Sequence, residues 1–331
     1  MDLWQDLADQ YRAFARDAAD SPTFAVWSAA VAEDAEVLAW LGSLPPLKQQ
    51  PNLVLAAARL HGVPAPGPYA ALRDALLGDG IDGPVRATIL SRSTQTNEVG
   101  RLATLVPAFA LLAARHGGAP WSLLEVGASA GLCLYPDRHT YRWRTGDGDV
   151  VVGAGPELAC DVTGPAPLPR HVPPVAARRG IDLNPLDVTS PDDVAWLETL
   201  VWPEHDDRRA RLRAALEVAR ADPPHVVAGD LLTELPRLVE EAAADGPVVV
   251  LHSAVIAYLD DAQRVAFDEL VRGLVADGAC HWVSNESPGV LPSITASAAS
   301  PAPEHHAFVL GVDGRAVAWT HGHGRTLHWL A

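Results

Sequence analysis

The stretch Ser122-Leu-Leu-Glu-Val-Gly-Ala-Ser-Ala-Gly-Leu-Cys-Leu134 decides the expected fold of this chain. Apolar residues lead to Glu125, then Gly127 and Gly131 follow with only small residues between them, and apolar residues resume. This order is typical of a buried parallel strand that ends in a tight turn and continues into a helix. Small side chains at such a turn let a ligand lie against the backbone, and the free N–H groups at a helix start attract polar or anionic groups.

Two chemistries use such a turn. Gly127-Ala-Ser-Ala-Gly131 fits G-x-S-x-G, the nucleophile elbow of α/β-hydrolases, with Ser129 as nucleophile. Together with its strand, Glu125-x-Gly127-x-Ser129-x-Gly131 resembles the first motif of class I S-adenosylmethionine (SAM) methyltransferases, with Ser129 in place of the middle glycine. The dinucleotide fingerprint G-x-G-x-x-G does not fit, because Ser129 and Leu132 occupy two of its glycine positions.

A hydrolase needs an acid and a histidine after Ser129 and an oxyanion-hole loop before it. His116-Gly117-Gly118 resembles such a loop, but it directly precedes the strand, where it more simply ends a helix. Histidines are plentiful near the C-terminus, so a triad is not excluded by counting. A Ser129 hydrolase therefore stays open as the alternative.

The methyltransferase interpretation predicts acidic residues at the ends of further strands. Residues 175–185 supply Asp182, whose carboxylate is suited to accept hydrogen bonds from both ribose hydroxyls, with Asn184 as a second candidate. Residues 225–232 supply Gly229 and Asp230, where an adenine amino group would dock. The predicted cofactor-binding residues are Glu125, Gly127, Ala128, Ser129, Gly131, Asp182, Asn184, Gly229 and Asp230.

Candidates for proton transfer follow the fourth and fifth expected strands. Residues 247–253 are apolar until His252, as expected of a parallel strand covered on both faces. Histidine is suited to general-base work near neutral pH, and Tyr258 and Glu286 also follow strand ends. We predict His252, Glu286 and Tyr258 as catalytic candidates. The alternative for His252 is a structural histidine bonded to a backbone carbonyl.

Gln95-Thr-Asn-Glu98 stands at the start of the helix that leads into the first strand. It is interpreted either as a helix N-terminus, with Thr96 or Asn97 as the cap and Glu98 favouring the dipole, or as part of the site. Because this helix is expected to pack beside the glycine turn, Gln95, Asn97 and Glu98 are predicted to contact the substrate or the amino-acid end of the cofactor.

About fifty residues separate Gly131 from Asp182, where one βαβ unit needs roughly twenty. Residues 141–152 read as a β-hairpin with a Gly-Asp-Gly turn, and a proline-rich segment follows. We therefore predict an insertion at about 139–174 that contributes to the substrate wall.

The predicted fold is α/β, a doubly wound, mostly parallel sheet of the class I methyltransferase type. Helical spacing of apolar residues before the glycine turn predicts an all-α N-terminal domain over residues 1–118. The Rossmann-like domain is expected over residues 119–331, with a C-terminal antiparallel hairpin around Asp313-Gly314.

Composition narrows the partners. The chain of 331 residues has a formal net charge of −16 and no basic run, which disfavours a nucleic-acid substrate. Its three cysteines are far apart and indicate neither a disulfide framework nor a zinc site. His321, His323 and His328 alternate like metal ligands, but no nearby carboxylate or cysteine completes a set, so no metal is predicted. Without a secretory signal or an apolar run of membrane-spanning length, a soluble cytoplasmic protein is expected.

Four motifs resemble the signatures of one bacterial family, catalogued as domain of unknown function 2332. They are residues 95–101, 124–132, 179–187 and 201–205, and the resemblance spans most of the chain. It implies a methyltransferase-like fold and no particular reaction. Cys133 departs from the family pattern, which usually has Asn there, and we expect altered binding if that position contacts ligand.

The leading hypothesis is a SAM-dependent methyltransferase that acts on an O, N or C acceptor of a small molecule or peptide. Catalysis would consist mainly of in-line positioning of the acceptor. The alternatives are the Ser129 hydrolase and a non-catalytic protein that binds SAM or a nucleotide or serves as a scaffold. Oligomeric state does not follow from the sequence.

Overall fold

The computed structural model describes residues 6–78, 82–95, 97–303 and 308–330. The chain forms two compact units, each built from two segments. The first comprises residues 1–96 and 189–213, and the second comprises residues 97–188 and 214–331. Helix α9 (Asp206–Ala221) contributes residues to both.

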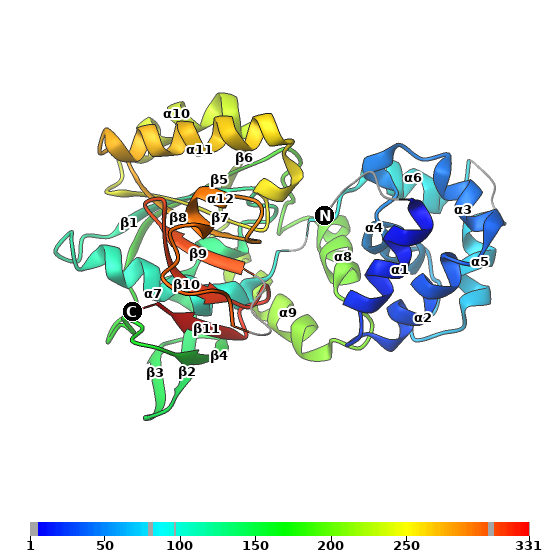
Figure 1. Cartoon of the computed structure of the whole chain (residues 1–331), viewed down its shortest axis with the longest axis horizontal. Helices are drawn as coiled ribbons and strands as arrows, with labels where there is room; N and C mark the ends of the chain where they lie inside the picture. The colour runs from blue at the N-terminus through cyan, green and yellow to red at the C-terminus, as the bar shows by residue number, and fades with distance from the viewer. Residues whose placement is uncertain (1–5, 79–81, 96, 304–307, 331) are drawn as a thin grey trace. The chain divides into compact units, whose positions relative to one another are not determined.

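The first unit consists of helices, and prolines mark the start of several of them (Figure 1). Pro22, Pro51, Pro84 and Pro191 lie in first turns, where the missing N–H of proline costs no hydrogen bond. The buried face of each helix supplies a core that includes the fully buried rings of Tyr11, Phe24 and Trp27. The helices are α1 (Leu7–Asp17), α2 (Pro22–Val31), α3 (Ala35–Gly42), α4 (Pro51–Leu60), α5 (Tyr69–Leu77), α6 (Pro84–Ser91) and α8 (Pro191–Leu200).

The second unit is built on one sheet. Its strands are β1 (Trp121–Val126), β2 (Thr140–Thr145), β3 (Gly148–Gly153), β4 (Glu157–Thr163), β5 (Val175–Asp182), β6 (His225–Ala228), β7 (Val248–Ser253), β8 (His281–Glu286), β9 (Phe308–Val312), β10 (Arg315–Thr320) and β11 (Thr326–Trp329). Its helices are η2 (Val99–Arg101), α7 (Leu102–Ala113), η3 (Leu132–Leu134), η4 (Pro136–Arg138), α10 (Leu231–Ala242), η5 (Ile256–Tyr258), α11 (Asp261–Ala276) and α12 (Pro292–Thr295).

The predicted doubly wound, mostly parallel sheet of the class I methyltransferase type is wrong. Among the described residues the sheet has eleven strands in the order β3-β2-β4-β11-β10-β9-β8-β7-β1-β5-β6, and it is mixed. Strands β6, β5, β1, β7 and β8 are parallel, whereas β9 is antiparallel to β8 and β10 is antiparallel to both β9 and β11. The fold is α/β with a large mixed sheet.

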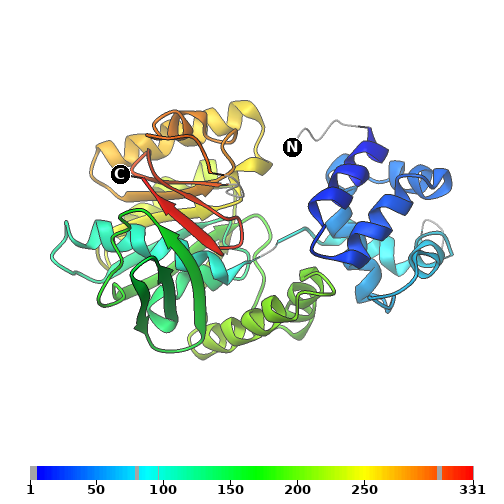
Figure 2. The same cartoon turned by 60° about the horizontal axis from the view of Figure 1, so that its bottom comes forward.

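The glycine turn accounts for part of this departure, because no α-helix follows it. The chain instead forms the short 3₁₀ helices η3 and η4, with Pro136 at the first position of the second. It then enters the antiparallel pair β2–β3 and the strand β4, within the range of the predicted insertion. Strand β4 pairs with β11, so these residues extend the sheet past its C-terminal strands (Figures 1 and 2).

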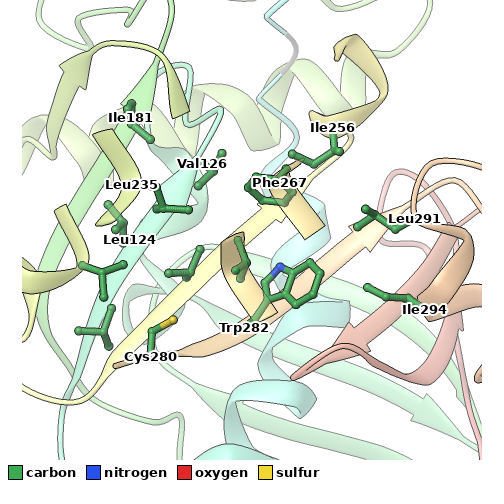
Figure 3. Close-up of a cluster of buried hydrophobic side chains, with 14 of the residues drawn as sticks. Leu124, Val126, Ile181, Leu235, Ile256, Phe267, Cys280, Trp282, Leu291 and Ile294 are labelled. Carbon is green, nitrogen blue, oxygen red and sulfur yellow. The ribbon is translucent and has the colours of Figure 1, made fainter. Parts of the chain in front are cut away.

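Helices α10 and α11 cover one face of the parallel strands, and α7 lies on the other face (Figure 1). The core beneath α10 and α11 is apolar (Figure 3). It includes Leu124, Val126, Ile181, Leu235, Phe267 and Trp282. Because side chains alternate along a strand, Glu125 faces away from this core, toward the α7 side. No described helix combines the length and hydrophobicity that crossing a lipid bilayer requires.

Candidate functional site

The strand order reverses at β1. Its neighbours are β5 on one side and β7 on the other, and the chain visits β5 and β6 before it returns to β7. In open α/β sheets, ligands bind outside the carboxyl ends of the strands at such a switch point. Three features lie at these carboxyl ends. They are the glycine turn after β1, Asp182 as the last residue of β5, and the loop after β7.

Backbone strain is concentrated on both sides of this switch point. In the turn after β1, Gly127, Ser129 and Gly131 have φ values of +66°, +52° and +69°. After β7, Ala254 has a φ of +59°. A left-handed residue other than glycine costs of order 1–3 kcal/mol and occurs preferentially at functional sites. Two of the three described non-glycine residues with positive φ, Ser129 and Ala254, thus lie at the ends of β1 and β7, and the third is Asp313 in the turn between β9 and β10.

The small residues of the turn are also required by packing. A Cβ on Gly127 would lie 2.4 Å from the side chain of Val255, and one on Gly131 would lie 2.8 Å from Pro224. Ala128 in turn packs so closely on β5 that a Cβ at Gly180 would lie 2.6 Å from it. The inner side of the turn is thus filled by protein, and contacts within the chain explain part of the glycine pattern.

Asp182 connects β5 to the glycine turn. Its Oδ2 accepts a hydrogen bond from the backbone N–H of Ser129, and its Oδ1 accepts one from Asn184, both at 2.8 Å. The backbone N–H of Gly229 donates to the carbonyl of Asp182 at 3.0 Å. These bonds orient the carboxylate of Asp182 beside the glycine turn. Asp230, at the end of β6, caps α10 by accepting from the N–H of Leu232.

The segment before η2 is joined to the glycine turn. Asn97 Oδ1 accepts from the N–H of Leu132 at 2.7 Å, and the thiol of Cys133 donates to the carbonyl of Glu98. Glu98, rather than Asn97, caps η2, because its Oε1 accepts from the N–H of Gly100. Gln95 belongs to the helical unit, and Thr96 lies outside the described residues.

A buried carboxyl group lies next to this junction. Glu125 is 5% exposed, and its Oε2 has no hydrogen-bond partner in the part of the chain that the structure describes. Burial raises its pKa well above the ordinary value, the charge of Asp182 raises it further, and that of Arg101 opposes both. Burial likewise raises the pKa of the Cys133 thiol. An acceptor without a partner costs free energy in the folded protein, and a ligand that donates to it would recover that energy.

His252 is part of a buried network. Its Nε2 lies 3.0 Å from the indole Nε1 of Trp282, and its Nδ1 lies 2.8 Å from Oε1 of Glu286. An indole N–H can only donate, so Nε2 is the acceptor and Nδ1 carries the proton that Glu286 accepts. The ring is 0% exposed. Both of its nitrogens are thus engaged, an arrangement that leaves no lone pair for a substrate.

Glu286 fixes the loop after β7. Its Oε1 also accepts from the N–H groups of Val255 and Ile256, at 2.9 and 3.1 Å. These bonds place Val255 against Gly127. Tyr258, the third predicted catalytic residue, is 56% exposed at the end of η5. The structure therefore pairs His252 with Glu286 inside the protein and leaves Tyr258 at the surface.

Sequence reasoning did not single out Arg101 or the turn between β10 and β11. Arg101 is buried, and its guanidinium donates to the carbonyls of Gly322 and Ser253, at 2.8 and 2.9 Å. These bonds hold the turn that carries His321 and His323 beside η2. A buried arginine bonded to carbonyls distant in sequence leaves no local pattern, although Arg101 does end the first family motif. Among the described residues no group of three His, Cys, Asp or Glu side chains is placed to hold a metal ion.

A family model described as "Uncharacterized protein conserved in bacteria (DUF2332)" matches residues 8–329. The chain belongs to this bacterial family. The resemblance inferred from the four motifs is thereby confirmed, and the family description names no reaction. No curated protein and no solved structure matches the chain. For this DUF2332 member, function has to be argued from the site itself.

Proposed function

We propose that this chain binds SAM at the carboxyl ends of β1, β5 and β7 and transfers its methyl group to a small molecule or peptide. One observation carries the proposal: a strained glycine turn, an oriented Asp182 and Glu125, whose Oε2 has no partner among the described residues, meet where the strand order reverses. This is the position at which open α/β sheets bind ligands. The mixed sheet is compatible with this proposed function, since function depends on the residues of the site and not on the whole fold.

The residues present fit the chemical groups of this cofactor. SAM carries an ammonium group and a sulfonium, both cationic, and Glu125 Oε2 is a buried acceptor without a partner. Its ribose presents two hydroxyls, and the carboxylate of Asp182, which the N–H groups of Ser129 and Asn184 orient, is an acceptor group suited to them. Cationic ligands favour the ionised form of a carboxyl, so we expect Glu125 to lose its proton when SAM binds.

SAM supplies an activated methyl group when it is bound. The chain would then bind and orient the acceptor in line with that group and exclude water from it. His252 is held by Trp282 and Glu286, so a base for acceptors that must lose a proton has to come from elsewhere. We expect the reaction to take place in the cytoplasm.

Calorimetric titration tests this proposal before any acceptor is known. The full chain is titrated with SAM, S-adenosylhomocysteine and NAD, together with the variants Asp182→Asn and Asp245→Asn. Asp245 is the matched control, since it pairs with Arg179 at the surface, away from the switch point. We expect SAM and S-adenosylhomocysteine to bind, Asp182→Asn to weaken both at least about tenfold, and Asp245→Asn to bind as the unmodified chain does.

Other outcomes would support the alternatives. Binding of NAD alone, or of none of the three compounds, contradicts the proposal. Covalent labelling of Ser129 by an organophosphonate probe would instead identify a serine hydrolase. SAM binding without methyl transfer to any tested small-molecule or peptide acceptor would favour a non-catalytic binding protein.

A further inference from the structure

Two histidines face each other near the amino end of β8, whereas the candidate site is at the carboxyl ends of the parallel strands. His116 follows α7, and His281 is the first residue of β8. Their Nε2 atoms lie 2.6 Å apart. The other ring nitrogen of His281, Nδ1, lies 3.1 and 3.2 Å from the two carboxylate oxygens of Asp313, in the turn between β9 and β10.

The neighbours of Asp313 determine which nitrogen carries the proton. Oδ1 of Asp313 also accepts the backbone N–H of Trp282 at 3.0 Å, and Oδ2 faces the guanidinium of Arg115 at 3.3 Å. This carboxylate is therefore an acceptor, and Nδ1 of His281 must donate to it. The lone pair of His281 is then on Nε2, directed at Nε2 of His116. A single proton lies between the two rings.

This arrangement is that of a metal half-site. Histidines that bind metals commonly donate their other ring N–H to a carboxylate, which fixes the tautomer and orients the ring. Trp121, the first residue of β1, packs edge-on against both rings, with centroid distances of 5.3 Å to His116 and 6.1 Å to His281. One carboxylate and one indole thus hold two imidazole nitrogens toward a common point.

The spacing allows an ion to replace the shared proton. Two bonds of 2.0–2.1 Å at a tetrahedral angle require the nitrogens to be roughly 3.3 Å apart, so the pair would open by under about 1 Å. His116 is exposed and precedes Gly117 and Gly118, whose φ values are +61° and +80°. A Cβ at either glycine would meet no atom of the described residues within 4 Å. The exposed segment after α7 has room for this small shift.

We propose that His116 and His281 bind a divalent transition-metal ion through their Nε2 atoms, with Asp313 orienting His281 and water completing the coordination. Imidazole ligands suit zinc, copper and nickel, whereas magnesium and calcium require oxygen ligands. The site is separate from the switch point and does not depend on the proposed methyl transfer.

Metal titration of the chelator-treated full chain tests this proposal. Zn²⁺ affinity is measured by calorimetry, and Cu²⁺ coordination by electron paramagnetic resonance, for the unmodified chain and for His116→Ala, His281→Ala and Asp313→Asn. His225→Ala is the matched control, because His225 is an exposed histidine at the start of β6. His116 makes its described contacts at the surface, so its variant is expected to fold even if His281→Ala does not.

We expect one ion per chain in the tightest site, a copper spectrum with two nitrogen ligands, and at least a tenfold loss of affinity in His116→Ala. Asp313→Asn should weaken binding about tenfold, since it removes the group that orients His281. His225→Ala should bind as the unmodified chain does. Equal affinities in the unmodified chain and His116→Ala would mean that the two rings only share a proton, and would overturn the proposal.

Discussion

Glu125 and Glu286 are two buried carboxyl groups on opposite faces of the same sheet, and their surroundings differ. Oε1 of Glu286, at the end of β8, accepts three hydrogen bonds, from His252, Val255 and Ile256. Oε2 of Glu286 and Oε2 of Glu125, near the end of β1, both accept none among the described residues. The difference lies in the three donors on Oε1 of Glu286, which make that acid a structural element, whereas a buried acid without donors is suited to a ligand. The comparison assigns Glu286 to the scaffold and Glu125 to the site.

The largest expected effect is on the scaffold side of this comparison. Replacing Glu286 by Ala leaves the Nδ1–H of His252 and two backbone N–H groups buried without an acceptor, which we expect to lower the free energy of unfolding by about 4 kcal/mol. Urea denaturation measures this loss in the free energy of unfolding. The control is Glu241→Ala, on the exposed side of α10. A loss under about 1 kcal/mol would show that Glu286 does not hold the loop.

The next effect concerns the contact between Gly127, in the turn after Glu125, and Val255, whose N–H is bonded to Glu286. Gly127→Ala places a Cβ at a φ of +66° and 2.4 Å from Val255, which Glu286 holds. We expect a loss of about 2 kcal/mol from left-handed strain and overpacking. In a double-mutant cycle, combining Gly127→Ala with Val255→Ala should recover the stability that overpacking costs and leave the loss that comes from the left-handed backbone. If the stability losses of the two single variants simply add in the double variant, the contact with Val255 does not explain why residue 127 is a glycine.

A smaller effect of opposite sign is expected at Glu125. Because its folded pKa is raised, its contribution to stability is full below the unfolded pKa and is lost as pH rises through the folded pKa. Glu125→Gln mimics the protonated group, so we expect the variant to be about 1 kcal/mol more stable at pH 8 and its stability to depend less on pH. Denaturation at pH 5 and pH 8 measures this. A variant less stable at pH 8 would mean that ionised Glu125 stabilises the fold.

Local sequence predicted the glycine turn after β1 and the strands β5, β6 and β7, because these elements depend on short patterns. The apolar run before Gly127, and the acids Asp182 and Asp230 that follow β5 and β6, are features of neighbouring residues. The mixed sheet could not be predicted in this way. Its extension depends on pairs such as Asp161 with Thr326, which are far apart in the chain and carry no local signal.

The same limit applies within the site. The imidazole of His252 is a suitable base by residue type, but Trp282 and Glu286, which occupy both of its nitrogens, come from another strand. Pro136 can be read from the sequence as the first residue of η4. The pairing of β4 with β11, which places the chain after η4 in the sheet, joins residues far apart in the sequence and could not be predicted from it.

The most direct test of the central claim is the pH dependence of SAM binding to the full chain and to Glu125→Gln. Calorimetry at pH 6 and pH 8, in buffers of different ionisation enthalpy, reports affinity and proton release together. Glu204→Gln is the control, since Glu204 accepts its hydrogen bonds from Ser21 and Thr23 in the helical unit. We predict proton release, tighter binding at pH 8, and at least tenfold weaker binding without proton release in Glu125→Gln. Identical binding by the unmodified chain and Glu125→Gln, or no binding by either, would contradict the account.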